Sequence, residues 1–187
     1  MLAGPSGIGK TYISKKLIEL KPADFRHANI VTTRPKRTNE EHVAINRIFV
    51  SSEEYKKLKN EGSFFIDESF AGYNYGYRKQ DFTSKNYNTL VDVSPCFLRN
   101  LSTTNTLFVG LSCSQDFLTK IEQRMTQRRD TTEIIKNRLP FVKRDLDDIE
   151  RYSGFINNFG KVFNIADDRE ADEKIIPWIL GNVPTGN

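Results

Sequence analysis

The eight residues GPSGIGKT, Gly4 to Thr11, constrain the fold of this chain more than any other stretch. They fit the pattern G-x-x-x-x-G-K-[ST], the Walker A loop, which joins a strand to a helix and surrounds phosphate groups with backbone amides. Glycines let the backbone approach the anion, the lysine adds a cation, and the threonine hydroxyl suits Mg²⁺. The pattern predicts binding of ATP or GTP by Gly4, Ser6, Gly7, Gly9, Lys10 and Thr11.

The residues after this loop predict a helix whose positive N-terminal dipole points at the same phosphates. Apolar residues recur at helical spacing in residues 10–20, and Pro22 follows the end of this segment. Strand-like runs at 88–93 and 106–111 also precede helical segments. Strands that alternate with helices indicate an α/β fold with a central parallel sheet flanked by helices. Later helices are expected after Ser94, at 114–125, up to about 152 and at 170–180, with a strand at 161–165.

Residues 32–88 depart from this alternation because their predicted elements are mostly short strands. We expect a single domain with a core of residues 1–31 and 89–187 and an inserted lobe at about 32–88. Ser51 and Glu54 form a capping box, which predicts a short helix that ends near Gly62. Strands are predicted at 28–33, 43–50 and 63–70, and a turn-rich stretch at 71–77.

Composition narrows the classes of partner. The net charge is +4, but the arginines cluster in two places and no long basic tract with interleaved aromatic residues occurs, so we do not expect a nucleic-acid partner. No apolar run approaches the roughly 20 residues of a membrane span. Neither a signal peptide nor metal-ligand spacing of Cys96 and Cys113 is recognisable, which favours a reducing, cytoplasmic setting. Both cysteines lie among apolar residues and are expected to be structural.

Asp92 is the second candidate for phosphate chemistry. It lies near the end of the predicted strand 88–93, and ligands bind outside the carboxyl ends of parallel strands. A carboxylate at this edge is suited to hold Mg²⁺ through water. We therefore predict Thr11 and Asp92 as the metal-binding residues.

Four motifs in this order resemble guanylate kinases: the GPSGIGKT loop, VTTRPKR at 31–37, IFVSSEEY at 48–55 and GYNYG at 72–76. A lid-like segment follows at 122–139, so the resemblance covers nearly the whole chain. It implies a P-loop kinase with an inserted acceptor-binding lobe and a lid at about 124–138. It also implies transfer of the γ-phosphoryl group of ATP, with Mg²⁺, to the phosphate of a small acceptor such as GMP.

The same resemblance assigns roles to arginines and one tyrosine. In the family, the two arginines of the TTRxxR motif bind the acceptor phosphate, which corresponds to Arg34 and Arg37, and the tyrosine before glycine corresponds to Tyr75. Guanidinium groups pair well with phosphate oxygens and stay charged at any working pH. The lid arginines correspond to Arg124, Arg128 and Arg138, with Arg128 on ATP. The predicted catalytic residues are Lys10, Arg34, Arg124 and Arg138.

The sequence departs from the family where guanine is read. Tyr77 stands in place of serine or threonine, Ile30 in place of serine, and Ile66 in place of a glutamate, although Asp67 is one residue away. Arg47 replaces an aromatic residue, and Ser94 replaces the second acid of a DxD strand end. Loss of hydrogen-bonding groups weakens discrimination of a base. We therefore expect weak guanine selectivity, with Asp67 and Asp92 as further acceptor-binding residues.

Two alternatives remain at this stage. EEHVAI at 40–45 resembles a segment of ribose 1,5-bisphosphate phosphokinases, which phosphorylate a sugar phosphate. Guanylate-kinase-like modules of scaffold proteins bind phosphopeptides without catalysis, but the retained Lys10, Thr11 and Asp92 favour an enzyme. We expect a monomer or homodimer.

Overall fold

The computed structural model describes residues 1–187 except 37–46, 71, 84–85, 101–104, 128–131 and 184–187. The chain forms two compact units, one of residues 1–17 and 91–184 and the other of residues 18–90. Among the described residues, no helix is both long and apolar enough to cross a bilayer.

A four-stranded parallel sheet organises the first unit. Its order is β10-β9-β1-β8, and all three pairings are parallel. The strands are β1 (Leu2–Ala3), β8 (Asp92–Val93), β9 (Phe108–Cys113) and β10 (Gly160–Ile165). This arrangement confirms the predicted α/β fold with a central parallel sheet. It also brings the loop after β1 next to the end of β8.

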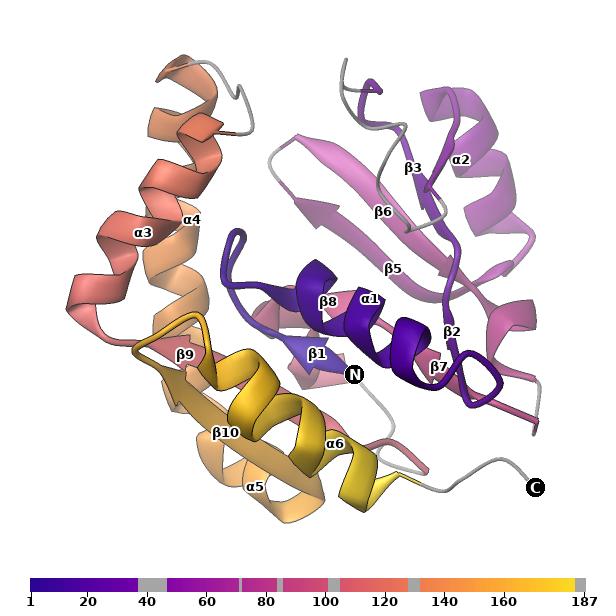
Figure 1. Cartoon of the computed structure of the whole chain (residues 1–187). Helices are drawn as coiled ribbons and strands as arrows, with labels where there is room; N and C mark the ends of the chain where they lie inside the picture. The colour runs from indigo at the N-terminus through magenta and orange to yellow at the C-terminus, as the bar shows by residue number, and fades with distance from the viewer. Residues whose placement is uncertain (37–46, 71, 84–85, 101–104, 128–131, 184–187) are drawn as a thin grey trace. The chain divides into compact units, whose positions relative to one another are not determined.

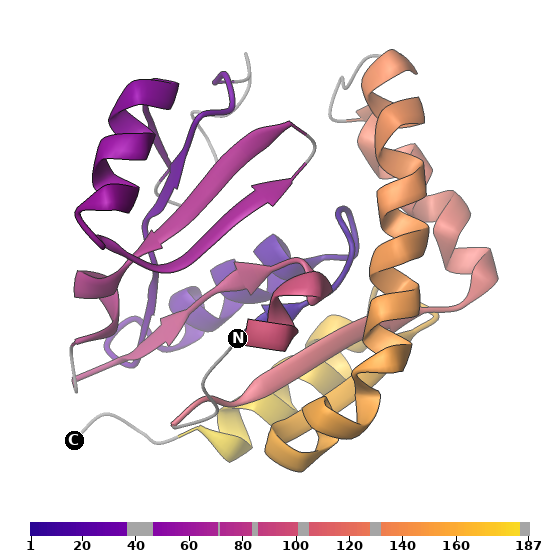
Figure 2. The same ribbon diagram turned by 180° about the vertical axis from the view of Figure 1, so that it is seen from behind.

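Helices cover both faces of this sheet. Figure 1 shows α1 and α6 in front of it, and Figure 2, the view from behind, shows α4 and α5 on the opposite face. Buried apolar side chains from the helices and the strands form the core between these layers, including Leu2, Ile13, Leu17, Phe108, Leu111, Ile149, Ile156 and Ile179. The helical segments are α1 (Lys10–Leu20), η3 (Pro95–Asn100), α3 (Gln115–Gln127), α4 (Thr132–Arg151), α5 (Ser153–Phe159), the π-helical η4 (Ala171–Ile175) and α6 (Ile176–Asn182).

The second unit contains a mixed sheet in the order β4-β3-β6-β5. Helix α2 (Ser52–Asn60) begins at the predicted cap, where the Ser51 hydroxyl accepts a hydrogen bond from the Glu54 amide at 3.1 Å. Tyr55 of α2 packs on Val31 and Phe64 of the sheet. The elements are β3 (Ile30–Thr32), β4 (Arg47–Phe49), β5 (Phe64–Phe70), β6 (Tyr73–Arg78), the 3₁₀ helix η2 (Lys79–Phe82) and a parallel pair of β2 (Phe25–His27) and β7 (Asn88–Leu90).

Some predicted elements were wrong in extent or type. The strand expected at 28–33 is shorter, since β3 begins at Ile30 after the Asn29 amide has donated to Asp81 at 2.7 Å, and the separate strand β2 just before it was not predicted. The run at 88–93 likewise divides into β7 and β8, which belong to different sheets. The expected turn at 71–77 is mostly β6, which pairs on both sides. The segment after Ser94 is a 3₁₀ helix rather than an α-helix.

Candidate functional site

The GPSGIGKT loop joins β1 to α1 as its sequence predicts. Gly7 and Gly9 have φ angles of 87° and 115°, in the left-handed region that favours glycine. Gly4 is required for a different reason, since a Cβ atom there would lie 2.8 Å from the carbonyl oxygen of Leu111 on β9. The three glycines therefore allow a tight loop pressed against the sheet, with the N-terminus of α1 directly after it.

Lys10 is held at this loop by backbone oxygens. Its ammonium nitrogen donates to the carbonyl oxygens of Gly4 at 2.5 Å and of Pro5 at 2.9 Å. The side chain is half-buried at the first position of α1, so its cation is confined to the loop. A confined cation beside a helix N-terminus is an arrangement suited to phosphate.

The residues predicted to hold Mg²⁺ come from neighbouring elements of the first unit. Asp92 is on β8, beside β1, and its Oδ1 accepts a hydrogen bond from the Ser14 hydroxyl of α1 at 3.0 Å. Thr11 is the second residue of α1 and is half-buried. A hydroxyl and a carboxylate are hard oxygen donors, and Mg²⁺ takes few protein ligands when phosphates and waters supply the others. The donor set therefore fits the ion.

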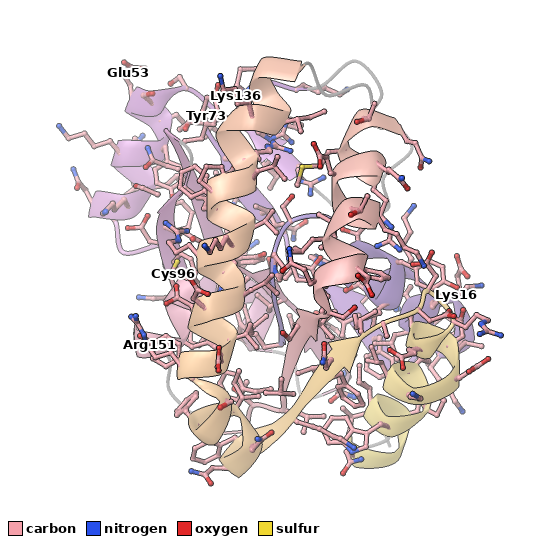
Figure 3. All side chains as sticks on the ribbon, turned by 90° about the vertical axis from the view of Figure 1, so that its left-hand side faces the viewer. Lys16, Glu53, Tyr73, Cys96, Lys136 and Arg151 are labelled. Atoms are coloured by element: carbon pink, nitrogen blue, oxygen red, sulfur yellow. The ribbon has the colours of Figure 1, made fainter. Side chains whose placement is uncertain are left out.

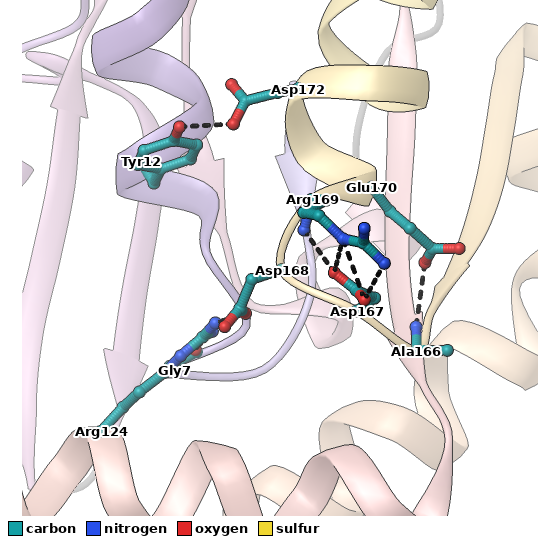
Figure 4. A network of polar contacts seen from close by, with 9 residues as sticks. All are labelled: Gly7, Tyr12, Arg124, Ala166, Asp167, Asp168, Arg169, Glu170 and Asp172. Atoms are coloured by element: carbon teal, nitrogen blue, oxygen red, sulfur yellow. Dashed lines mark hydrogen bonds and ion pairs between the residues drawn. The ribbon is translucent and has the colours of Figure 1, made fainter.

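Arg124 of α3 reaches the loop, as shown in Figure 4. Its Nη1 donates to the carbonyl oxygen of Gly7 at 2.8 Å, and its Nη2 forms an ion pair with Asp168. The guanidinium also lies over the ring of Phe117, with 5.0 Å between its carbon and the ring centroid. The structure thus places a predicted lid arginine at the phosphate loop.

Acidic residues of the segment after β10 complete this network (Figure 4), and sequence reasoning missed them. Asp172 accepts a hydrogen bond from the Tyr12 hydroxyl of α1 at 2.7 Å. Asp167 binds the Arg169 side chain and amide, and these contacts lower the pKa of Asp167 to about 2. The only sequence signal was the density of acids in residues 167–173. Together with Asp168, this segment joins α1 and α3 beside the loop.

Arg34 and Tyr75 lie at the same end of the β3–β6 pair in the second unit. Tyr75 pairs with Thr32, and the Arg34 amide donates to the Thr32 hydroxyl at 3.1 Å. Arg34 is only 7% exposed, its Nη1 donates to the Pro35 carbonyl at 2.8 Å, and its guanidinium lies over the Phe49 ring. The structure therefore brings together two of the predicted acceptor-phosphate residues.

Asp67 lies on the other face of this sheet. It pairs with Gly76 of β6, and its carboxylate accepts a hydrogen bond from the Tyr55 hydroxyl of α2 at 2.7 Å. Lys59 of α2 lies 2.6 Å from the same carboxylate. Burial and the Asp67 carboxylate raise the pKa of Tyr55 above its usual value. Tyr75 neighbours Gly76 in the strand and faces the opposite side, so the structure does not bring Asp67 to Tyr75.

Four of the positions that depart from the family pattern form one line across the sheet. Arg47 pairs with Ile30, Ile30 with Tyr77, and Tyr77 with Ile66. A register shift between Phe64 and Ile66 puts Ile66 opposite Tyr77, on the same face as Tyr75. Ile30, Ile66 and Tyr77 are all buried. The four residues that differ from the family pattern are therefore neighbours in the sheet, and they make this part of it mostly apolar.

The other predicted site residues are less defined. Ser6 is half-buried in the loop, and Arg138 is half-buried on α4. Arg37 and Arg128 lie outside the described residues. The EEHVAI stretch at 40–45 lies there too.

Comparisons with known proteins agree with these observations. A guanylate kinase family profile matches residues 1–161. The guanylate kinase of Homo sapiens is 30% identical over 151 residues, covering 79% of this chain and 76% of the relative. That of Syntrophotalea carbinolica is 27% identical over 162 residues, covering 84% and 76%.

A solved structure shows the same fold. The crystal structure of guanylate kinase from Anaplasma phagocytophilum matches with a TM-score of 0.66 at 19% identity, over 96% of this chain and 82% of the other. The family match favours a nucleotide kinase over the sugar-bisphosphate kinase and the binding module. The loop, the sheet and these similarities lead to one conclusion: the chain belongs to the guanylate kinase family.

Proposed function

We propose that this protein transfers the γ-phosphoryl group of ATP to the phosphate of a nucleoside monophosphate, with GMP as the first candidate. The observation that carries the proposal is the loop at Gly4–Thr11, which holds the Lys10 ammonium and receives Arg124 at the Gly7 carbonyl. Two cations fixed at one phosphate-binding loop are suited to stabilise the charge of a transferring phosphoryl group.

The chemistry requires alignment and charge neutralisation more than covalent catalysis. An acceptor phosphate oxygen is already ionised at neutral pH, so no general base is needed. Lys10 and Arg124 would neutralise the ATP phosphates, with Arg138 and Arg128 as further lid cations. Mg²⁺, held near Thr11 and Asp92, would supply Lewis-acid charge to the phosphate oxygens when bound.

Arg34 and Tyr75 would bind the acceptor phosphate, with Arg37 as a further ligand of the same phosphate. Arg34 supports this role because its buried guanidinium lies over the Phe49 ring and donates to the Pro35 carbonyl, contacts that hold it at the same end of the β3–β6 pair as Tyr75. A guanidinium group can pair with two oxygens of one phosphate.

The acceptor base is a finer part of the proposal. The line of Ile30, Tyr77 and Ile66, in which two of the three side chains are purely apolar, supports loose selection among bases, because fewer hydrogen-bonding groups discriminate less strongly. The clustered arginines support a small phosphate as the partner. The thiols of Cys96 and Cys113, neither of which forms a disulfide, support a cytoplasmic enzyme, which we propose acts as a monomer or homodimer.

ADP release in a coupled assay tests this function. MgATP is supplied with GMP, dGMP, AMP, CMP, UMP and, as a separate arm, ribose 1,5-bisphosphate. Turnover with one or more nucleoside monophosphates is the expected result, with a selectivity for GMP below about a hundredfold. Turnover with the sugar bisphosphate alone, or with none of these acceptors, would contradict the proposal.

A further inference from the structure

Asp145 is a buried carboxylate on α4 whose position the proposed chemistry does not yet explain. It is 2% exposed, and transfer of an ionised carboxylate into a protein interior costs several kcal/mol unless charges and hydrogen bonds compensate. Arg144, the preceding residue of α4, is partly exposed, and its Nη2 lies 3.4 Å from Asp145 Oδ1, which is a weak contact. The carboxylate therefore needs further partners within the first unit.

One partner is Ser94, the residue directly after β8. The Ser94 hydroxyl donates to Asp145 Oδ1 at 2.8 Å and accepts a weaker bond from the Cys96 thiol at 3.5 Å. Figure 3 shows α4 running between Lys136 and Arg151, with Cys96 beside its middle turns. Asp145 thus anchors the end of β8 from α4.

The end of β8 adjoins the phosphate loop. β8 pairs in parallel with β1, and the Gly4 amide approaches the Val93 carbonyl at 3.4 Å. Asp92, two residues before Ser94, belongs to the same short strand. A shift of Ser94 would therefore be transmitted to both the start of the loop and the candidate metal carboxylate.

The second partner is Lys10. Burial raises the pKa of Asp145, while the Ser94 hydrogen bond and the charges of Lys10 and Arg144 oppose that rise. The Lys10 charge thus favours the ionised carboxylate, and Lys10 is also linked to the end of β8, since its ammonium donates to the Gly4 carbonyl and the Gly4 amide approaches the Val93 carbonyl. Among the described residues, Ser94 directly after β8, Lys10 of α1 and Arg144 of its own helix are thus the groups that act on Asp145.

We propose that Asp145 is a positioning residue of the phosphate site, which fixes the end of β8 through Ser94 and holds the Lys10 ammonium by its charge. This inference rests on the proposed binding of ATP at the loop, but not on the identity of the acceptor. It assigns to α4 a role in preparing the site for nucleotide.

Equilibrium binding of Mg²⁺ with β,γ-methylene-ATP, measured by calorimetry, tests this role. Asp145→Asn is the main variant, and Ser94→Ala removes the hydrogen bond while keeping the charge. Asp148→Asn is the matched control, because Asp148 is 4% exposed on the same helix and lies 3.7 Å from Arg151 instead. The melting temperature of each variant is recorded beside its Kd.

We expect Asp145→Asn to weaken binding about 10–100-fold, as loss of a supporting carboxylate typically does, and Ser94→Ala to weaken it less. Asp148→Asn should stay within about threefold of wild type, as expected of a residue outside the site. Removal of a negative charge would by itself tighten binding of an anion, so weaker binding reports lost positioning. Unchanged or tighter binding by Asp145→Asn, no effect of Ser94→Ala, or an equal loss in Asp148→Asn would overturn the proposal.

Failure of this binding test can be distinguished from failure of the acceptor assay. A wild type that binds the nucleotide but transfers to no acceptor contradicts the proposed function and leaves this binding test valid. A wild type that does not bind the nucleotide contradicts both.

Discussion

Arg124 donates a hydrogen bond from Nη1 to the carbonyl oxygen of Gly7 at 2.8 Å, which ties helix α3 to the phosphate loop. The same guanidinium pairs with Asp168 and lies over Phe117. Arg124 is therefore already held beside the loop at which the ATP phosphates are proposed to bind. Its role there can be separated from that of its acidic partner.

Replacement of Arg124 by methionine should lower kcat about 100–1,000-fold, since it removes a cation aimed at developing charge. Asp168→Asn should lower kcat less than about fivefold, because the Asp168 side chain is 59% exposed and exposed ion pairs contribute about 0–1 kcal/mol. Steady-state kinetics of the two variants checks this. A loss in Asp168→Asn as large as that in Arg124→Met would show that the ion pair, not the cation at the loop, matters.

Lys10→Ala should abolish measurable transfer, a loss of about a thousandfold or more, while the fold stays intact. Lys10 donates hydrogen bonds to two carbonyls of its own loop, which supports a local role. Lys16→Ala, later in the same helix, is the control and should keep wild-type activity. Circular dichroism, melting temperature and kcat are measured together. Wild-type turnover by Lys10→Ala would refute the role of the loop.

Asp145→Asn should raise the melting temperature at pH 7. Burial raises the pKa of Asp145, so the folded state binds the proton more tightly than the unfolded state does. The stabilisation from this proton is fully present below the unfolded pKa of about 3.9 and is lost as the pH rises through the folded pKa. Above the folded pKa the wild type therefore carries an ionised, partly desolvated carboxylate that asparagine avoids.

Melting curves of both proteins between pH 8 and about pH 4 check the sign. The advantage of the variant should shrink as the pH falls towards the unfolded pKa of about 3.9. An advantage that grows on acidification, or a variant less stable than wild type at pH 7, would contradict this reading of the buried carboxylate.

Gly76→Ala should destabilise the second unit by about 1–3 kcal/mol. A Cβ atom at this position of β6 would lie 2.6 Å from the ring of Phe64, which packs under α2. Gly154→Ala is the matched control, because a Cβ there meets nothing within 4 Å and helical glycine is about 0.5–1 kcal/mol less favourable than alanine. Urea unfolding of both variants measures the difference. Equal stability of the two would mean that Phe64 moves aside without cost.

Features set by neighbours in sequence could be predicted from the chain alone. The loop, the helix after it and the Ser51 cap depend on residues within a few positions of one another, and the structure has them where the sequence indicates. The parallel sheet followed from the alternation of strands and helices.

Features that depend on residues far apart in the sequence could not be predicted from the chain alone. Ser94 meets Asp145 across 51 positions and Arg124 meets Asp168 across 44, and no local pattern encodes such contacts. The Asn29–Asp81 hydrogen bonds, across 52 positions, lie between β2, which was not predicted, and the start of β3. The register shift before Ile66 also decides which residue shares the face of Tyr75, and a one-residue shift is invisible in composition.

The proposed function requires that the loop at Gly4–Thr11 delivers a phosphoryl group to an acceptor nucleotide. This transfer is measured by following label from [γ-³²P]ATP in the presence of Mg²⁺ and GMP, with wild type and Lys10→Ala in parallel. We expect label in GDP for the wild type and none above background for the variant. Label released only as inorganic phosphate, or found in GDP at equal rates with both proteins, would contradict it.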